Sequence, residues 1–252
     1  MKKLLQSYLR KFGVDVLSLS YSREYIYEHH LAEMLERYAI KTVIDVGANI
    51  GGYGQLLRRI GFKGRIISFE PVSEPYEKLS ALASKDPLWE TFPCALGQRH
   101  ETKAINVMAG SELCSFLAPN ESSQKMTVVS KREIEVRTLD SVANIDWSTT
   151  FVKLDTQGHD VAVMTGAREV LQKTVMLQSE LSFLPIYREM PDFSQALQLM
   201  RELGFDVTGF FPVSRDAHRR VKEFDCLAVN RNLLPPARWP QMPVGGVFPK
   251  QA

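Results

Sequence analysis

The sequence contains few cysteines, little net charge and no long hydrophobic run. Cys94, Cys114 and Cys226 are its three cysteines, and they form no CxxC or Cys/His cluster, which argues against a structural zinc site. Lys and Arg number 31 and Asp and Glu 29, so the formal net charge is only +2. This balance disfavours nucleic-acid binding through a broad basic field. No stretch approaches the roughly 18 apolar residues of a membrane span, and we expect a cytoplasmic protein with reduced thiols.

The two ends of the chain differ in composition from its middle. Residues 1–16 (MKKLLQSYLRKFGVDV) lack the continuous apolar core of a secretory signal. They have the pattern of an amphipathic helix, which packs on its own domain, packs on a second subunit, or lies peripherally on a membrane. Residues 231–252 contain five prolines, which exclude a regular helix. We expect this tail to cover the protein surface or to contact a neighbouring subunit in a homo-oligomer.

Strand-like and helix-like segments alternate through the middle of the chain, which indicates βαβ units and a doubly wound parallel sheet. The expected strands are residues 42–46, 65–69, 91–96, 151–154, 175–178, 205–211 and 224–229. The expected helices are residues 25–38, 55–60, 73–83, 160–165 and 193–203. The polar loop 212–223 is typical of a hairpin, so the last two strands should be antiparallel. The sequence thus predicts an α/β fold with a seven-stranded, mostly parallel sheet and one antiparallel strand near its edge.

Residues 98–150 interrupt this alternation. Two extended segments, 104–108 and 125–136, predict an inserted β-hairpin, and between them lies the sequence SELCSFLAPN (111–120). We therefore divide the chain into an N-terminal helical segment (1–41), a main domain (42–230) and a proline-rich tail. The insert and residues 182–190 are expected to shape a substrate pocket.

A glycine-rich turn follows the first expected strand in the sequence VIDVGANIGGYG (43–54). Glycines allow a sharp turn and a close approach of the backbone to a ligand, and the next helix points free N–H groups at that ligand. The spacing is not that of a G-x-G-x-x-G dinucleotide site, which disfavours NAD. Asp45 suits a cationic group, whereas Asn49 and the helix N-terminus suit a carboxylate. The amino-acid end of S-adenosylmethionine (SAM) carries both charges.

A second feature lies at the end of the second expected strand, in ISFEP (67–71). A carboxylate at this position, here Glu70, accepts hydrogen bonds from ribose hydroxyls, and Ala95 and Leu96 should lie near the adenine. The sequence therefore predicts SAM as the cofactor. The full predicted cofactor-binding set is Asp45, Gly47, Ala48, Asn49, Tyr53, Gly54, Glu70, Pro71, Ser73, Ala95, Leu96 and Asp155.

Two carboxylates at neighbouring strand ends are candidates for the chemistry. Asp155 lies in FVKLDTQGHD (151–160), and Glu180 lies in MLQSELSFLPIY (176–187). They could clamp a divalent cation such as Mg²⁺ together with a sugar diol, or hydrogen-bond sugar hydroxyls without a metal. Alternatively, one of them forms a structural ion pair with Lys153, or Asp155 caps a helix. His159 is a further candidate for the base that removes a hydroxyl proton. The predicted catalytic residues are Asp155, Glu180 and His159, and the predicted metal ligands are Asp155 and Glu180.

At these segments the sequence resembles the FkbM family of SAM-dependent methyltransferases. The resemblance covers residues 42–230 and rests on VIDVGANIGGYG, SFEPVSEPYEKL, VRTLDSV, FVKLDTQGHDVAVMTGA, QSELSFLPIY and DCLAVN. It implies the class I methyltransferase fold and assigns cofactor binding to Asp45, Gly47, Asn49 and Glu70. It also implies active-site positions for Asp155 and Glu180, and O-methylation of a sugar, glycan or polyketide hydroxyl.

Other functions fit parts of the sequence less well. Enzymes that methylate amino groups of DNA or RNA usually carry an N/D-P-P-Y motif where this chain has DTQG, so we expect no nucleic-acid partner. A non-catalytic SAM-binding regulatory subunit would keep the glycine turn but has no need of Asp155 or Glu180. The sequence thus favours an O-methyltransferase acting on a sugar or glycan, with a polyketide or other natural product as the alternative acceptor.

Overall fold

A computed structural model describes residues 22–120, 126–142 and 144–234 of the 252-residue chain. The predicted N-terminal helix within residues 1–16 and most of the proline-rich tail lie outside these ranges. In the described part, no helix is long and apolar enough to cross a bilayer.

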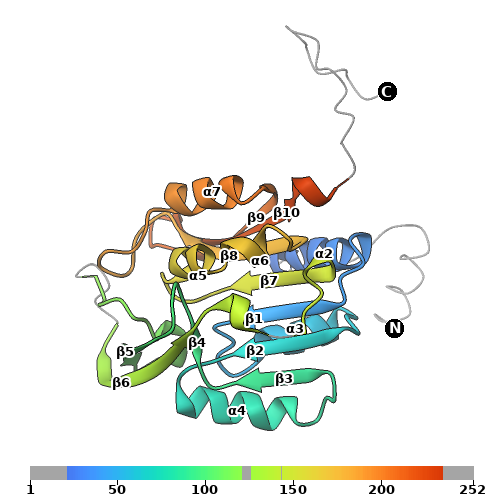
Figure 1. Ribbon diagram of the computed structural model, residues 1–252. Coiled ribbons are helices and arrows are strands. Elements are labelled where there is room, and N and C mark those ends of the chain that lie inside the picture. Colours follow the sequence, from blue (N-terminus) through green and yellow to red (C-terminus); the bar gives the residue numbers. More distant parts are fainter. Residues whose placement is uncertain (1–21, 121–125, 143, 235–252) are drawn as a thin grey trace, which may run out of the picture.

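The core of the fold is a seven-stranded sheet with the order β3-β2-β1-β7-β8-β10-β9 (Figure 1). Its strands are β1 (Thr42–Val46), β2 (Arg65–Phe69), β3 (Trp89–Phe92), β7 (Thr150–Leu154), β8 (Met176–Ser182), β9 (Phe205–Arg215) and β10 (Val221–Asn230). Neighbouring strands from β3 to β8 run parallel, whereas β10 is antiparallel to both β8 and β9. This confirms the predicted fold class, with one reversed strand next to the edge.

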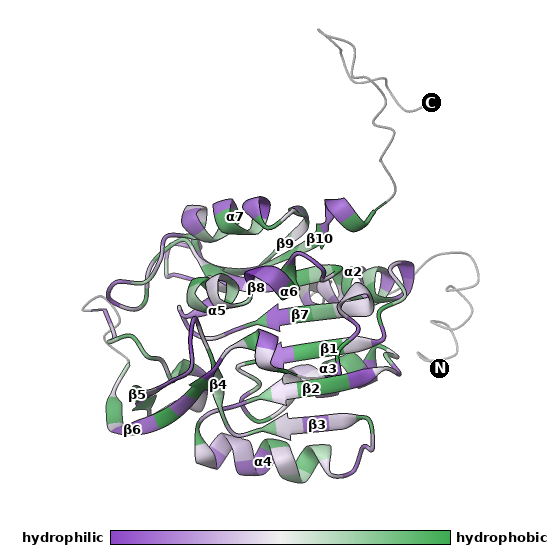
Figure 2. Cartoon of the chain, in the orientation of Figure 1, coloured by the Kyte–Doolittle hydropathy of each residue, from purple (hydrophilic) through white to green (hydrophobic). Residues whose placement is uncertain are grey.

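Helices cover both faces of this sheet because successive strand residues alternate between two apolar cores. One core packs against α5 (Asp160–Gly166), α6 (Arg168–Leu171) and α7 (Phe193–Glu202). The other packs against α2 (Ser22–Arg37), α3 (Gly52–Arg59) and α4 (Ser73–Ala83). In Figure 2 the central strands are mostly hydrophobic, while α7 alternates hydrophobic and hydrophilic residues, as expected of a helix with one face in water.

The inserted region forms a second, smaller sheet. Its order is β4-β6-β5, with β4 at Ala95–Leu96, β5 at Glu101–Met108 and β6 at Val128–Arg137. The antiparallel pair β5–β6 is the predicted hairpin. Figure 1 shows this sheet beside the carboxyl ends of the parallel strands, which is where open α/β folds bind ligands.

Three local predictions need correction. The single third strand expected over 91–96 is two strands, because β3 pairs with β2 whereas β4 turns away and pairs with β6. The helix expected over 55–60 begins three residues earlier, at Gly52. The short helix α6, which has only four residues, was not predicted.

Candidate functional site

The glycine turn brings the end of β1 against the end of β7. Gly47 has a φ of 79°, and a Cβ at this position would lie 1.9 Å from the carbonyl oxygen of Asp155. The amides of Gly47 and Ala48 both donate to the carbonyl of Phe69 on β2, at 3.0 Å each. The turn therefore joins three strand ends at one point, and its glycine is required by both conformation and space.

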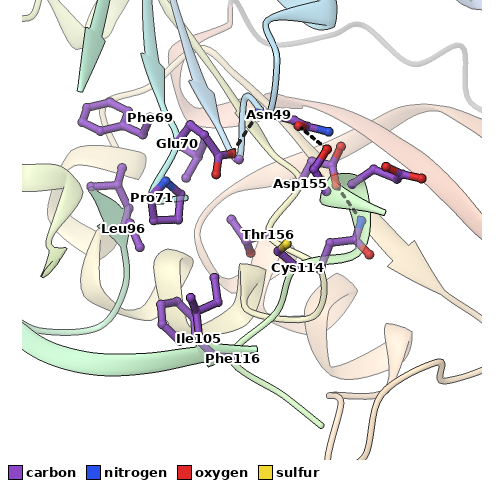
Figure 3. Close-up of a pocket in the computed structure, with 16 residues that line it drawn as sticks. Asn49, Phe69, Glu70, Pro71, Leu96, Ile105, Cys114, Phe116, Asp155 and Thr156 are labelled. Carbon is purple, nitrogen blue, oxygen red and sulfur yellow. Dashed lines mark hydrogen bonds between the residues drawn. The ribbon is translucent and has the colours of Figure 1, made fainter. Parts of the chain in front are cut away.

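A cavity opens beside this turn and extends toward the small sheet, with about 630 Å³ of empty volume including open solvent. Figure 3 shows Phe69, Pro71 and Leu96 at one end, Asp155 at the other, and Glu70 between them. Seven predicted cofactor-binding residues line this cavity: Gly47, Asn49, Glu70, Pro71, Ala95, Leu96 and Asp155.

Glu70 is held in a fixed orientation by the backbone. Its Oε2 accepts from the amide of Asn49 at 2.9 Å, and its Oε1 accepts from the amide of Val72 at 2.8 Å. Each carboxylate oxygen keeps a second lone pair for a ligand hydroxyl. Burial raises the pKa of Glu70 to about 7, even though the two backbone hydrogen bonds oppose the shift.

The segment 111–120, which we call the covering segment, forms another wall of the same cavity. Ser111, Glu112, Cys114 and Phe116 contribute to the lining, and Ser111 donates to the Asn49 side chain at 3.0 Å. The insert that contains this segment is expected from the sequence to shape a substrate pocket, whereas the lining residues of the segment face the cavity that contains Glu70. Ile105 on β5 completes this apolar side.

Other predicted cofactor-binding residues lie elsewhere. Gly54 packs against Trp89, since a Cβ there would lie 2.1 Å from the indole ring. Ser73 is exposed and does not line the cavity. Ala48 and Tyr53 line a neighbouring cavity, and Asp45 is fully buried in the sheet.

Asp45 belongs to a polar row across an otherwise apolar sheet face. The register places Ser68, Asp45 and Lys153 side by side on β2, β1 and β7, and Gln178 follows on β8. The ammonium of Lys153 lies 3.2 Å from carboxylate oxygens of both Asp45 and Asp155 and 5.0 Å from the centre of the Tyr53 ring. Burial disfavours the charged ammonium, but the two carboxylates outweigh it and raise the pKa of Lys153. The structural ion pair between Lys153 and Asp155, which was one of the alternatives from the sequence, is therefore present.

Asp155 and Glu180 are brought together at the ends of β7 and β8. A single amide nitrogen, Nε2 of Gln157, donates to Asp155 at 3.0 Å and to Glu180 at 2.9 Å. Burial and the negative charge of Asp155 raise the pKa of Glu180 well above its usual range. Burial also disfavours ionised Asp155, but Lys153 and Gln157 outweigh that effect and lower its pKa. The pair therefore favours one shared proton, carried on Glu180.

A second, more open cavity lies on the other side of the turn, with about 910 Å³ of empty volume including open solvent. It shares Gly47, Asn49 and Asp155 with the first cavity. Its polar lining includes Tyr27, Lys153, Gln178, Glu180 and Asp225. Asp155 thus stands where the two cavities meet.

The polar lining of the second cavity is ordered by hydrogen bonds. The hydroxyls of Tyr27 and Tyr53 lie 2.9 and 3.2 Å from the side-chain oxygen of Gln178. The Gln178 side chain also bonds to Asp225, whose pKa burial nevertheless raises to about 7. Sequence reasoning missed Tyr27, Gln178 and Asp225. For Gln178 and Asp225, the sequence signal was a single polar residue within an expected strand that is otherwise apolar.

His159 does not line either cavity. It is the N-cap residue of α5, and its ring packs 4.8 Å from the ring of Phe116. Burial lowers its pKa to about 4, so it is neutral at physiological pH. The structure thus separates His159 from Asp155 and Glu180.

The predicted metal site is not supported. Across the described ranges, no three His, Cys, Asp or Glu side chains are grouped as metal ligands. The oxygens of Asp155 and Glu180 instead accept from Gln157 and Lys153. Two carboxylates that are already hydrogen-bonded are a poor donor set for Mg²⁺, which demands octahedral oxygen coordination.

The solved structures to which this chain is similar include several methyltransferases. The FkbM methyltransferase from Methylobacillus flagellatus KT is 16% identical, with a TM-score of 0.49 over 74% of this chain and 43% of that one. This chain therefore spans less than half of that protein. A 1,6-didemethyltoxoflavin-N1-methyltransferase from Burkholderia thailandensis is 13% identical, with a TM-score of 0.46 over 81% of this chain and 77% of that one. The magnesium protoporphyrin IX methyltransferase from Synechocystis PCC 6803 is 9% identical, with a TM-score of 0.44 over 91% and 96%.

The sequence itself matches no curated protein. It does match the methyltransferase FkbM domain over residues 45–207, which is more than half of the chain. That range contains the glycine turn, Glu70, Asp155 and Glu180, the residues around which both cavities are built. The chain belongs to the FkbM methyltransferase family.

Proposed function

We propose that this protein transfers the methyl group of SAM to a hydroxyl of a sugar or glycan. The observation that carries the proposal is the position of Asp155 in the wall shared by two cavities. One cavity has the features of a cofactor site and the other is open and polar. A carboxylate at their junction can face the acceptor hydroxyl where the methyl group is delivered.

The first cavity fits SAM by its chemistry. Its apolar end, with Phe69, Leu96 and Ile105, suits an adenine ring. Glu70 has lone pairs available for the ribose hydroxyls, and the carboxylate of Asp155 at the opposite end suits a cationic group. When bound, SAM supplies a methyl group already activated on a sulfonium.

The protein would then contribute mainly position and proton transfer. The acceptor hydroxyl would lie against Asp155 and Glu180, and the ionised Asp155 would accept its proton. Lys153 holds the Asp155 carboxylate in place through the 3.2 Å contact. The predicted base His159 is not part of this proposal, because it lines neither cavity and its ring packs against Phe116.

A sugar is the acceptor class that the second cavity favours. Carboxylates, a carboxamide and tyrosine hydroxyls, here Glu180, Asp225, Gln178, Tyr27 and Tyr53, can donate and accept hydrogen bonds with several hydroxyls at once. The faces of the tyrosine rings offer apolar surface to the C–H face of a sugar ring. A cavity for a mostly apolar polyketide would need fewer buried carboxylates, since each is costly to desolvate.

The test is transfer of labelled methyl from SAM to a panel of nucleotide sugars, glycosides, amino sugars and macrolide aglycones. A methyl ether on a sugar, identified by NMR, supports the proposal. Methyl attached to nitrogen, or label only on the macrolides, contradicts it. Asp155→Asn should lower kcat by at least about 100-fold while SAM still binds in calorimetry; normal turnover by this variant would exclude the role of Asp155.

A further inference from the structure

Gln157 occupies an unusual place in the candidate site. It lies two residues after Asp155 and has a positive φ of 52°, which turns the chain back over the strand end. Its side-chain nitrogen has two hydrogens, one directed to Asp155 and the other to Glu180, at 3.0 and 2.9 Å. Both donors of one amide are therefore engaged by the two candidate catalytic carboxylates.

The orientation of this amide is fixed from its other side. The hydroxyl of Tyr187 lies 2.9 Å from Oε1 of Gln157 and 2.8 Å from the carbonyl oxygen of Leu113. Tyr187 is only 1% exposed. A flipped amide would direct its oxygen at both carboxylates, so neither would accept a hydrogen bond from Gln157. The observed orientation gives a donor to each carboxylate and places an acceptor beside the Tyr187 hydroxyl.

Gln157 is also joined to the covering segment. The Ser115 hydroxyl donates to the main-chain oxygen of Gln157 at 2.7 Å. Tyr187 bonds Leu113 of the same segment, and the backbone of residues 118–120 pairs with that of residues 186–188. The residue that bridges the carboxylates is therefore anchored on both sides by elements that close the cofactor cavity.

The groups around Asp155 and Glu180 are mostly acidic, so the hydrogen bonds from Gln157 offset an unfavourable electrostatic environment. Lys153 forms an ion pair with Asp155, but within the described ranges no Lys or Arg forms one with Glu180. The ionisable groups whose electrostatic effects act on the pair are Asp45 on β1, Lys153 on β7, Asp160 on α5, Tyr187, and Glu223 and Asp225 on β10. Most of these groups are acidic and repel a second negative charge. Neutral donors from Gln157 reduce that repulsion without adding a charge.

We propose that Gln157 is a positioning residue whose two amide hydrogens hold the carboxylates of Asp155 and Glu180 together at the junction of the two cavities. Its effect on catalysis rests on the proposed function, but its effect on the carboxylates does not. Because an amide donor bonds an ionised carboxylate more strongly than a neutral one, Gln157 favours the deprotonated form of each carboxyl group. Without it, Glu180 should hold its proton to a higher pH.

The test follows the carboxyl carbon of Glu180 by NMR in protein labelled with ¹³C at the glutamate carboxyl group, with the signal assigned through Glu180→Gln. In Gln157→Met, which has a similar length but no donors, the midpoint of the Glu180 titration should rise by about one pH unit. Tyr187→Phe should move it in the same direction by less, because the amide remains but loses its anchor. Gln172→Met, an exposed glutamine, is the matched control and should not move it.

An unchanged midpoint in Gln157→Met would overturn the proposal. If that variant does not fold, Gln157→Asn serves instead, since asparagine tolerates a positive φ but is too short to reach both carboxylates; it should also raise the midpoint, and an unchanged midpoint would again overturn the role. The titration needs neither acceptor nor turnover. A shifted midpoint in a protein that transfers no methyl group would therefore contradict the proposed function and leave the role of Gln157 intact.

Discussion

The ammonium of Lys153 lies 3.2 Å from a carboxylate oxygen of Asp45, and their side chains are only 6% and 0% exposed. This contact changes the role expected for Asp45, which the sequence assigned to the cofactor. Asp45 lies in the polar row of the sheet, where it also accepts from Ser68 at 3.5 Å. Asp45 pairs with Lys153, which in turn pairs with Asp155 at the candidate site.

Replacing Lys153 by Met should destabilise the protein strongly. The change leaves the buried Asp45 and the partly exposed Asp155 without their cation, and breaking a buried pair such as Lys153–Asp45 costs about 3–5 kcal/mol. Urea unfolding at pH 7.5 measures the loss, with the exposed Lys173→Met as the control. If the Lys153 and Lys173 variants have the same free energy of unfolding, the charge of Lys153 does not stabilise the polar row.

SAM affinity should depend on the ionisation of Glu70. Its pKa is raised to about 7 by burial, and ribose hydroxyls donate to the ionised form. SAM binding should therefore weaken as the pH falls below about 7, approaching tenfold per pH unit. Calorimetry between pH 5.5 and 7.5 measures the slope. In Glu70→Gln the affinity should be lower and the slope smaller, whereas Glu77→Gln, on an exposed part of α4, should behave as the wild type.

The parts of the site that the sequence predicted are short motifs, each made of residues that are consecutive in the chain. The glycine turn and Glu70 lie at the ends of short apolar strands, and local pattern is enough to place a strand end at the ligand-binding edge of an α/β sheet. The inserted hairpin was visible for the same reason, because alternation over its second strand is a local signal.

The missed residues reach the site through tertiary contacts. Tyr27 lies on α2, far from the matched motifs, and Phe116 reaches the cofactor cavity only because β5 and β6 fold beside the strand ends. Sequence patterns specify which face of an element is apolar, but not which distant element covers it. Gln178 could have been found by aligning the strands, since Lys153 and Gln178 are register partners.

Asp225 should make a contribution to the stability of the protein that decreases as the pH rises from about 4 to 7. Its pKa is raised from an ordinary 3.8 to about 7, mainly by burial and then by the charge of Asp155. In this window the folded state binds more protons than the unfolded state, so the free energy of unfolding falls with increasing pH. Asp225→Asn should remove about 1–3 kcal/mol of this loss between pH 5 and 8. Urea unfolding at both pH values checks the prediction, which fails if wild type and variant lose the same stability.

Tyr27→Phe should impair acceptor binding and spare the cofactor. The variant loses the hydroxyl that lies 2.9 Å from the side-chain oxygen of Gln178, while the ring that lines the second cavity remains. A lost hydrogen bond of about 1 kcal/mol corresponds to a rise of several-fold in KM for the acceptor. Steady-state kinetics with the best acceptor of the panel and calorimetry with SAM separate the two effects. Tyr38→Phe, on the same side of the sheet but outside both cavities, is the control. Loss of SAM affinity in Tyr27→Phe would place Tyr27 in the cofactor site instead.

Two glycines of the turn should respond in opposite ways to alanine. Gly47 has a positive φ, and its new methyl group would meet the carbonyl oxygen of Asp155 at 1.9 Å, a contact with backbone that no side-chain rotation relieves. Gly47→Ala should therefore push the ends of β1 and β7 apart, abolish SAM binding in calorimetry and lower the melting temperature. Gly52 begins α3, and a Cβ there would meet nothing within 4 Å. Gly52→Ala should keep wild-type SAM affinity and gain a few tenths of a kcal/mol in stability from the better helix former. If both variants bind SAM equally well, the close approach of Gly47 to Asp155 is not what shapes the cofactor cavity.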